Sequence, residues 1–156
     1  MEENKNNETV DFLEKVIIND IKLMQDKGLY YLSFALMASA IETLGAFLDK
    51  KPLRARAQSY KRFNLAVERL FPSKYKQINK NGFLYDKLRN HLSHNLLPSS
   101  YLILIDTEND SQKHLNFENE KLIVAADVFY KDLKNATLKI IDKINKGELK
   151  NIKFVN

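Results

Sequence analysis

Apolar residues recur at intervals of three and four along most of the chain, the spacing that places side chains on one face of an α-helix. This pattern predicts helices over residues 10–26, 29–48, 54–70, 83–97 and 120–144. Before the last of these, Tyr101–Ile105 is β-branched and aromatic, and the apolar residues Leu115 and Phe117 alternate with polar neighbours. We therefore expect a mainly all-α fold, a bundle of about five helices with a small β-hairpin before the last helix.

Glycine or proline stands near the end of most predicted helices and separates one from the next. Residues 1–9 are polar and rich in Asn, so we expect a disordered N-terminal tail there, and residues 147–156 form a C-terminal tail. The remaining residues, 10–146, are enough to bury a core without disulfides or metals. We assign them to a single helical domain.

The segment Leu29–Leu48 has two interpretations. It is 20 residues long with Glu42 as its only charge, which is enough to span a bilayer. Four small or polar residues dilute its hydrophobicity, however, and Glu42 would be costly at membrane depth. A helix that is apolar on nearly all sides also belongs in a protein core. We favour a central helix of a soluble bundle, with no membrane association.

Composition narrows the chemistry further. The chain has no cysteine, which removes disulfides, thiolate nucleophiles and cysteine-ligated zinc, and its three histidines make a multi-histidine site hard to build. We expect neither a metal nor a cofactor. The first nine residues do not resemble a secretory signal, because they lack a basic start followed by an apolar run. These features favour a cytoplasmic protein.

Basic charge is concentrated in one part of the sequence. Residues 50–89 hold 12 Lys and Arg against two acids, so this basic segment carries +10 and the rest of the chain −5. Six aromatic residues are interleaved with these cations: Tyr60, Phe63, Phe71, Tyr75, Phe83 and Tyr85. Single-stranded nucleic acid sites use this mixture for backbone attraction and base stacking. The alternative is a solvated lysine face whose aromatic residues belong to the core.

The predicted helix over residues 83–97 carries the most specific pattern. Leucine recurs at every fourth position and forms an apolar face: Leu84, Leu88, Leu92 and Leu96. On the opposite face, Asn90 and His94 lie one turn apart, with Arg89 at their flank. An imidazole beside a guanidinium can exchange protons and neutralise a phosphate. This helix is therefore the candidate site.

Arg89-Asn90-x-x-x-His94 resembles the motif of the HEPN superfamily, on a late helix of a small bundle. Residues 10–144 fit that family loosely in helix order, and only residues 89–94 are specific. The resemblance implies metal-independent RNA cleavage where two copies of the motif helix meet in a homodimer. His94 would exchange protons with the 2′-hydroxyl or the leaving oxygen, Arg89 would neutralise the phosphorane, and Asn90 would orient His94 or the phosphate.

Glu42 and Ser93 are supporting candidates. A carboxylate in the most apolar helix needs a partner, so we expect Glu42 to reach the dimer cleft and pair with Arg89. Ser93 lies on the motif helix beside His94. Plainer explanations exist for the same residues. Arg89 could pair with Asp86 at the surface, and the polar face could simply be solvated.

Three functions fit these observations. The leading one is an endoribonuclease of the kind found in toxin–antitoxin or phage-defence systems. The partners of this endoribonuclease would be RNA, a second copy of the chain and an antitoxin or regulatory protein. The second is a non-catalytic module of the same type that binds a nucleotide, RNA or a protein. The third is a structural dimer whose polar pair fixes the helix register. His91 and His114 fall outside the motif, and we assign them no role.

Overall fold

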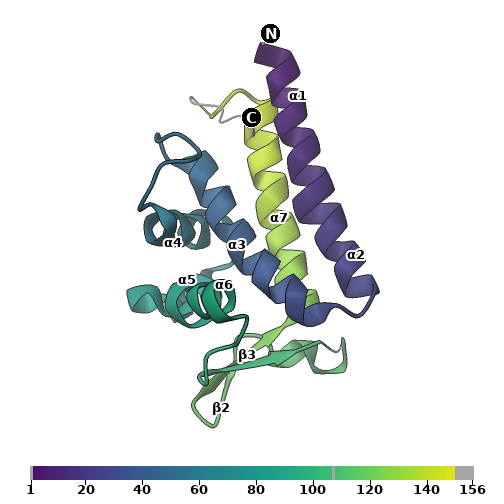
Figure 1. Ribbon diagram of the computed structural model, residues 1–156, viewed down its shortest axis with the longest axis vertical. Coiled ribbons are helices and arrows are strands. Elements are labelled where there is room, and N and C mark those ends of the chain that lie inside the picture. Colours follow the sequence, from purple (N-terminus) through teal and green to yellow (C-terminus); the bar gives the residue numbers. More distant parts are fainter. Residues whose placement is uncertain (1, 107, 150–156) are drawn as a thin grey trace.

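The central helix of the fold is α3 (Tyr30–Leu48), with other helices on either side of it. The structure, a computed structural model, describes residues 2–106 and 108–149. This part of the chain has six helices, five of them seven residues or longer, and a small three-stranded sheet before the long final helix (Figure 1). The predicted mainly helical class with a small β element before the last helix is confirmed.

The N-terminal helix is longer than its apolar pattern predicts. α1 (Glu2–Phe12), a π-helical stretch (Leu13–Asp20) and α2 (Ile21–Asp26) follow one another without a break. No glycine or proline interrupts this sequence, and Thr9 is buried with its hydroxyl donating to the carbonyl of Lys5 at 3.0 Å. The helix therefore begins at Glu2 rather than at Val10, and the described residues of the predicted tail are helical.

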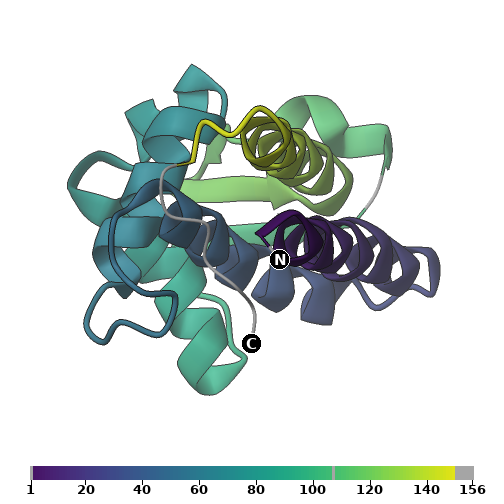
Figure 2. The same ribbon diagram turned by 90° about the horizontal axis from the view of Figure 1, so that it is seen from above.

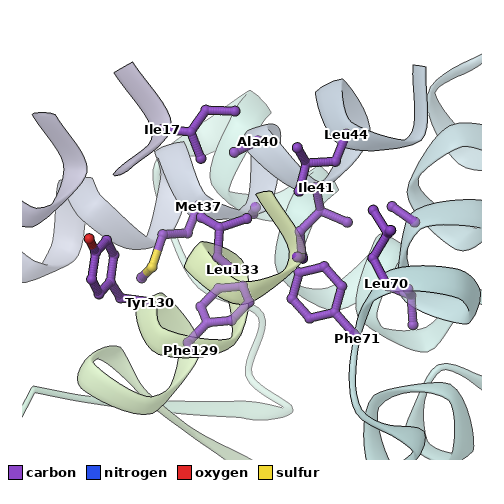
Figure 3. Close-up of a cluster of buried hydrophobic side chains, with 14 of the residues drawn as sticks. Ile17, Met37, Ala40, Ile41, Leu44, Leu70, Phe71, Phe129, Tyr130 and Leu133 are labelled. Atoms are coloured by element: carbon purple, nitrogen blue, oxygen red, sulfur yellow. The ribbon is translucent and has the colours of Figure 1, made fainter. Parts of the chain in front are cut away.

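The last helix, α7 (Ala126–Asn145), lies beside the N-terminal helix (Figures 1 and 2). Both views place α3 between this pair and a group of three helices, α4 (Ser59–Leu70), α5 (Ser73–Ile78) and α6 (His91–Asn95) (Figures 1 and 2). Side chains from three regions meet in the core, among them Met37 and Ile41 of α3, Phe129 of α7 and Ile17 of the N-terminal helix (Figure 3). The predicted C-terminal tail begins after α7, and its residues 150–156 lie outside the described residues.

α3 is long and apolar enough to cross a membrane by length and composition. More than half of it is nevertheless buried by other helices, which accounts for its apolar character, as expected for the central helix of a bundle. One side remains uncovered. Leu29, just before the helix, and Tyr31, Leu32 and Leu36 within it are between 41% and 47% exposed. This exposed apolar stripe lies on the helix that also carries Glu42.

α4 (Ser59–Leu70) packs unusually close to α3 at Gly45. A Cβ atom built on Gly45 would lie 1.9 Å from the carbonyl oxygen of Arg62, so only glycine permits this approach. α4 begins at Ser59 rather than at the predicted Arg54. Ala57, just before it, has a left-handed backbone with φ of 55°, which a helix does not accommodate.

The helix that carries the motif differs from a regular α-helix. After α5 (Ser73–Ile78) and a 3₁₀ turn (Lys80–Gly82), residues 83–95 form one continuous helix, the motif helix. It contains a π-helical segment (Tyr85–Asn90) followed by α6 (His91–Asn95). Three of the four predicted core leucines are buried: Leu84, Leu88 and Leu92.

The fourth leucine, Leu96, does not belong to the core. It is 55% exposed, because the helix ends at Asn95 and the backbone of Leu96 turns left-handed with φ of 54°. The prediction that the leucine face extends to Leu96 is therefore wrong. The wider turn of the π segment also changes the angular spacing on which that prediction rested.

The sheet lies at the end of the molecule where α7 begins (Figure 1). β1 (Leu102–Ile105) pairs in parallel with β3 (Lys121–Ala125), and β2 (Phe117–Glu118) pairs with β3 in antiparallel orientation. The predicted hairpin between 101–105 and 115–117 is wrong. Leu122 to Ala125 are buried on both sides and form a strand, although their apolar run also fits the start of the last helix.

Candidate functional site

The motif helix is fixed at its start by Asn79. The side-chain oxygen of Asn79 accepts the N–H of Leu84 at 2.9 Å and that of Tyr85 at 3.4 Å, which satisfies donors that a helix start leaves unpaired. Its amide nitrogen donates to Asn64 Oδ1 of α4 at 2.7 Å. One side chain thus caps the motif helix and ties it to α4.

Arg89 and Glu42 form an ion pair between the motif helix and α3. An Nη2–Oε2 distance of 2.7 Å joins them, and their side chains are only 18% and 24% exposed. The predicted pairing of Glu42 with Arg89 is confirmed. The alternative partner, Asp86, pairs instead with Lys87 at 2.8 Å, and this hydrogen bond lowers the pKa of the Asp86 carboxyl.

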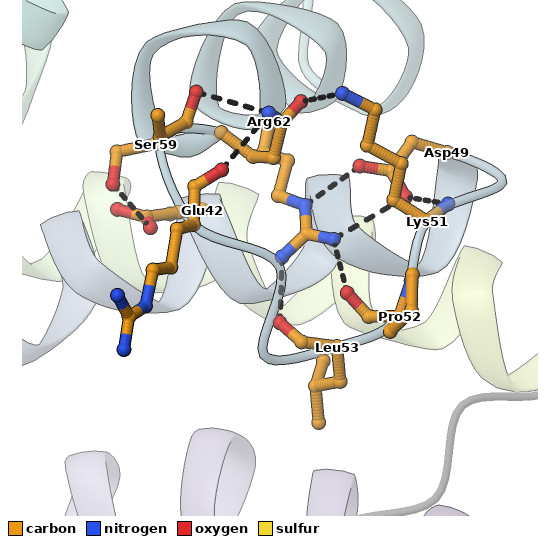
Figure 4. Close-up of polar contacts among 10 residues, drawn as sticks. Glu42, Asp49, Lys51, Pro52, Leu53, Ser59 and Arg62 are labelled. Carbon is orange, nitrogen blue, oxygen red and sulfur yellow. Dashed lines mark hydrogen bonds and ion pairs between the residues drawn. The ribbon is translucent and has the colours of Figure 1, made fainter.

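Ser59 completes this ion pair. Its hydroxyl donates to Glu42 Oε1 at 2.7 Å, and Arg89 Nη2 lies 3.5 Å from the same hydroxyl oxygen. The hydrogen bond from Ser59 to Glu42 is drawn in Figure 4. Both carboxylate oxygens of Glu42 are therefore engaged, one by the Arg89 cation and one by the Ser59 hydroxyl. Ser59 is not among the predicted site residues, because the sequence pattern places it inside a predicted helix that in fact begins only at this residue.

Ser59 is held in place by a charged centre under the α3–α4 loop. Arg62 is 4% exposed and donates to Asp49 Oδ2 at 2.6 Å and to the carbonyls of Pro52 and Leu53, each at 2.7 Å (Figure 4). Such a fully hydrogen-bonded fork compensates the cost of burying a guanidinium. Arg62 thus fixes the loop that leads into α4, and with it the position of Ser59.

The rest of the Arg89 guanidinium is less tightly held. Its Nη1 donates to Asn90 Oδ1 at 3.3 Å, and its Cζ lies 5.6 Å from the centre of the Tyr85 ring. Its Nε is buried and finds no hydrogen-bond partner among the described residues. A guanidinium that is fixed on one side by Glu42 still has donor capacity for an anionic group.

His94 and Ser93 lie beyond this cluster. Both are exposed, and neither side chain forms a hydrogen bond or ion pair with the residues that the structure describes. Asn90, half-buried, is one turn before His94 on the same helix. The structure therefore brings Arg89, Asn90 and Glu42 together, and presents His94 to the surrounding solvent one turn further on. In a single chain, no hydrogen bond within the described residues orients its imidazole.

His114 belongs to a separate buried hydrogen-bond chain. Its Nδ1 accepts the N–H of Ala125 at 3.0 Å, so the neutral ring carries its proton on Nε2, which lies 2.8 Å from the Tyr75 hydroxyl. Tyr75 in turn donates to Asp132 at 2.8 Å. Burial, reinforced by the charge of Lys74, lowers the pKa of His114 to about 4. The imidazole is a neutral structural element of the core.

The basic segment, residues 50–89, divides between surface and core. Most of its cations are exposed, while Arg62 is buried and Lys87 and Arg89 are half-buried. Three of its six aromatic residues belong to the core, namely Phe63, Phe71 and Tyr75, as the alternative interpretation predicts. Phe83 and Tyr85 are half-buried, and Tyr60 alone is exposed, at 52%. Tyr60 is thus the one aromatic ring of the segment that is exposed enough to contact a ligand.

The comparisons with known proteins add no function. No protein-family model, no curated protein and no solved structure matches this chain. Within the described residues, no three His, Cys, Asp or Glu side chains are grouped so that they could hold a metal ion. The function is therefore argued from the geometry of the site.

Proposed function

We propose that the chain is a metal-independent endoribonuclease of the HEPN type, whose active site is completed by a second copy of the chain. The carrying observation is the ion pair between Glu42 and Arg89, closed by Ser59. It fixes the motif arginine in a defined position beside Asn90, on the helix that exposes His94 one turn later.

The reaction follows from these groups. The RNA 2′-hydroxyl attacks the adjacent phosphorus while a neutral His94 imidazole takes its proton. The bond to the 5′-oxygen then breaks, and that oxygen takes a proton from an imidazolium, which leaves a 2′,3′-cyclic phosphate and a 5′-hydroxyl end. Arg89 neutralises the additional charge on the phosphorane. A phosphate oxygen would take over Nη1, whose bond to Asn90 is long at 3.3 Å.

A second chain is needed because one His94 cannot serve as base and acid at the same time. The surface next to His94 suits such a contact. Leu96 and Leu97, which follow His94 in the sequence, are 55% and 65% exposed. Leu32 and Leu36 on α3, a helix that contacts α6, are also uncovered. Exposed apolar side chains near a polar site mark protein–protein contacts. In a dimer, the histidines of the two copies would supply the base and the acid.

The test uses purified protein and a labelled single-stranded RNA in the presence of EDTA. We expect cleavage with 2′,3′-cyclic phosphate ends, and no cleavage of DNA of the same sequence, which lacks the 2′-hydroxyl. His94→Ala should lower the rate at least ~100-fold, as expected for loss of a general acid or base. His91→Ala, three residues away and outside the motif, is the matched control.

Because the His94 side chain is exposed and forms no hydrogen bond or ion pair with the described residues, His94→Ala should leave the melting temperature unchanged. Unaltered cleavage by this variant, or cleavage that EDTA abolishes, would contradict the proposal.

A non-catalytic RNA- or nucleotide-binding module is the second candidate. One observation favours it: Glu42 already neutralises Arg89 within a single chain. Binding of RNA that weakens steeply with salt, without any cleavage by a confirmed dimer, would support this function instead.

A further inference from the structure

A pocket of about 250 Å³ lies between α4 and the turn that precedes the motif helix. Tyr60 and Asn64 of α4 form one side, and Asn79, Asn81 and Gly82 form the other. The pocket does not contain Arg89, Asn90 or His94, and the proposed chemistry does not use it. Its size suits a small planar group rather than a larger ligand.

The aromatic wall of this pocket is rigidly placed. The Tyr60 ring rests on the backbone of Gly82, where an added Cβ would come within 2.5 Å of the ring. The edge of Tyr60 also meets Tyr85 at a centroid distance of 5.1 Å and an interplanar angle of 89°. Although it is supported on two sides, Tyr60 is 52% exposed. A ring held in this way can stack on a ligand with little loss of conformational freedom.

Amide groups supply the polar side of the pocket. Asn64 uses its Oδ1 to accept from Asn79, and no partner for its Nδ2 is found among the described residues. Asn81 is exposed and has a left-handed backbone conformation. Its side-chain amide forms no hydrogen bond with the described residues. Asparagine offers both donors and acceptors, the combination that reads the edge of a nucleobase. Lys76 at the rim adds a cation, paired with Glu68 at 3.2 Å.

Two aromatic contacts connect this pocket with the motif arginine. The Tyr60 and Tyr85 rings are 5.1 Å apart, and Arg89 Cζ lies 5.6 Å from the centre of Tyr85. A base on Tyr60 and a phosphate at Arg89 could therefore belong to the same short strand. Asn79 couples the two places mechanically, since it lines the pocket and caps the motif helix.

We infer that this pocket binds one unpaired nucleobase of a single-stranded RNA, stacked on Tyr60 and hydrogen-bonded to Asn64 and Asn81, close to the phosphate that Arg89 engages. This base pocket rests on the proposed ribonuclease function and extends it. A base bound in this pocket holds the RNA strand in one position. It thereby determines which phosphate of the strand lies at Arg89.

The experiment measures binding separately from cleavage. A fluorescein-labelled 2′-O-methyl RNA 10-mer of mixed sequence, which lacks the nucleophilic hydroxyl, is titrated with the full chain and followed by anisotropy. Tyr60→Ala should raise the Kd about 5- to 100-fold, the usual effect of losing one base–aromatic stack. Tyr60→Phe keeps the ring and should bind within about 3-fold of the wild type. Tyr101→Ala, at an equally exposed tyrosine, should leave the Kd unchanged.

A second measurement does not depend on any variant. Irradiation of the wild-type chain with the same oligomer carrying 5-iodouridine should cross-link the peptide that contains Tyr60. Equal affinities of Tyr60→Ala and the wild type, an equal loss in Tyr101→Ala, cross-links confined to other peptides, or no binding by the wild type would each overturn the base pocket. If the wild type cleaves RNA while Tyr60→Ala binds normally, only the pocket fails. If Tyr60 matters for binding and no RNA is cleaved, only the nuclease fails.

Discussion

Glu42 and Arg89 lie 2.7 Å apart and join the most apolar helix of the chain to the motif helix. Removing two charges from water is costly, and the pair offsets that cost only because Ser59 occupies the second carboxylate oxygen. Ser59 is in turn held by the loop that Arg62 anchors. The position of the motif arginine therefore depends on a series of polar contacts that runs from the α3–α4 loop to the motif helix.

Glu42→Gln should destabilise the fold and slow RNA cleavage. The amide keeps the size of the side chain but loses the charge, so Arg89 is left partly buried without its counter-ion. We expect a loss of about 2 kcal/mol in the free energy of unfolding, measured by urea denaturation. Cleavage should fall about 10-fold or more, because Arg89 is no longer held in one position.

The control is Asp142→Asn, which removes an ion pair with Lys146 of the same length, 2.7 Å, but 58% exposed on both sides. It should leave the free energy of unfolding nearly unchanged, because an exposed ion pair contributes little to stability. Equal effects of the two substitutions would show that the Glu42 pair is an ordinary surface pair.

Leu96→Asp should weaken the dimer that the proposed function requires. Leu96 is exposed beside His94, and aspartate tolerates its left-handed backbone better than leucine does, so the monomer fold should persist. Light scattering after size-exclusion chromatography should show a larger monomer fraction, with parallel loss of RNA cleavage. Leu23→Asp on α2, at the same 55% exposure, should leave both unchanged. A wild type that stays monomeric at high concentration would argue against the shared site.

His114 should make the fold less stable in mild acid. Its pKa is about 4 in the folded chain, against 6.5 for an exposed histidine. Between these values the unfolded chain binds a proton that the folded chain does not, so stability is complete above pH 6.5 and falls as the pH drops towards 4. The loss from this group amounts to at most about 3 kcal/mol.

The measurement compares denaturation of the wild type and His114→Gln from pH 7 to pH 4. The variant should lose this part of the pH dependence. Burial raises the pKa of Asp132, which acts in the opposite direction in both proteins. The difference between the two pH profiles reports the loss of the imidazole together with any change that this loss causes at Asp132 through Tyr75. Identical slopes would mean that folding does not lower the pKa of His114.

Gly45→Ala should be among the most damaging small substitutions in the chain. Its Cβ would overlap the carbonyl oxygen of Arg62, and neither backbone can move without separating α3 from α4. We expect a loss of about 3 kcal/mol or more in urea denaturation. Gly28→Ala, where nothing lies within 4 Å and only a φ of +75° is strained, should cost about 1 kcal/mol. A smaller effect at Gly45 than at Gly28 would contradict this close packing.

The sequence predicts a residue's position or partner correctly where the chemistry of that residue alone requires it. Leu84, Leu88 and Leu92 are buried as their spacing predicts. Glu42 is an ionisable group in an apolar helix, and its need for a partner identifies Arg89 before the fold is known.

The sequence does not predict structural features that depend on contacts with distant parts of the chain. The run from Leu122 to Ala125 suits a buried strand and a buried helix equally, and only parallel pairing with β1 decides between them. No residue near Ser59 in the sequence indicates that Ser59 contacts Glu42. His114 has no local signal either, since the partners that bury it, Tyr75 and Asp132, lie in other elements.

Because Arg62 anchors the α3–α4 loop through main-chain atoms, the path of this loop does not depend on the charges of its exposed side chains. Arg62 grips the main-chain carbonyls of Pro52 and Leu53, so the loop holds its path whatever side chains it displays. Lys50, Arg54 and Arg56 are exposed, and their side chains form no hydrogen bond or ion pair with the described residues. Substitutions at these positions could therefore raise or lower the attraction of the loop for polyanions without changing its path.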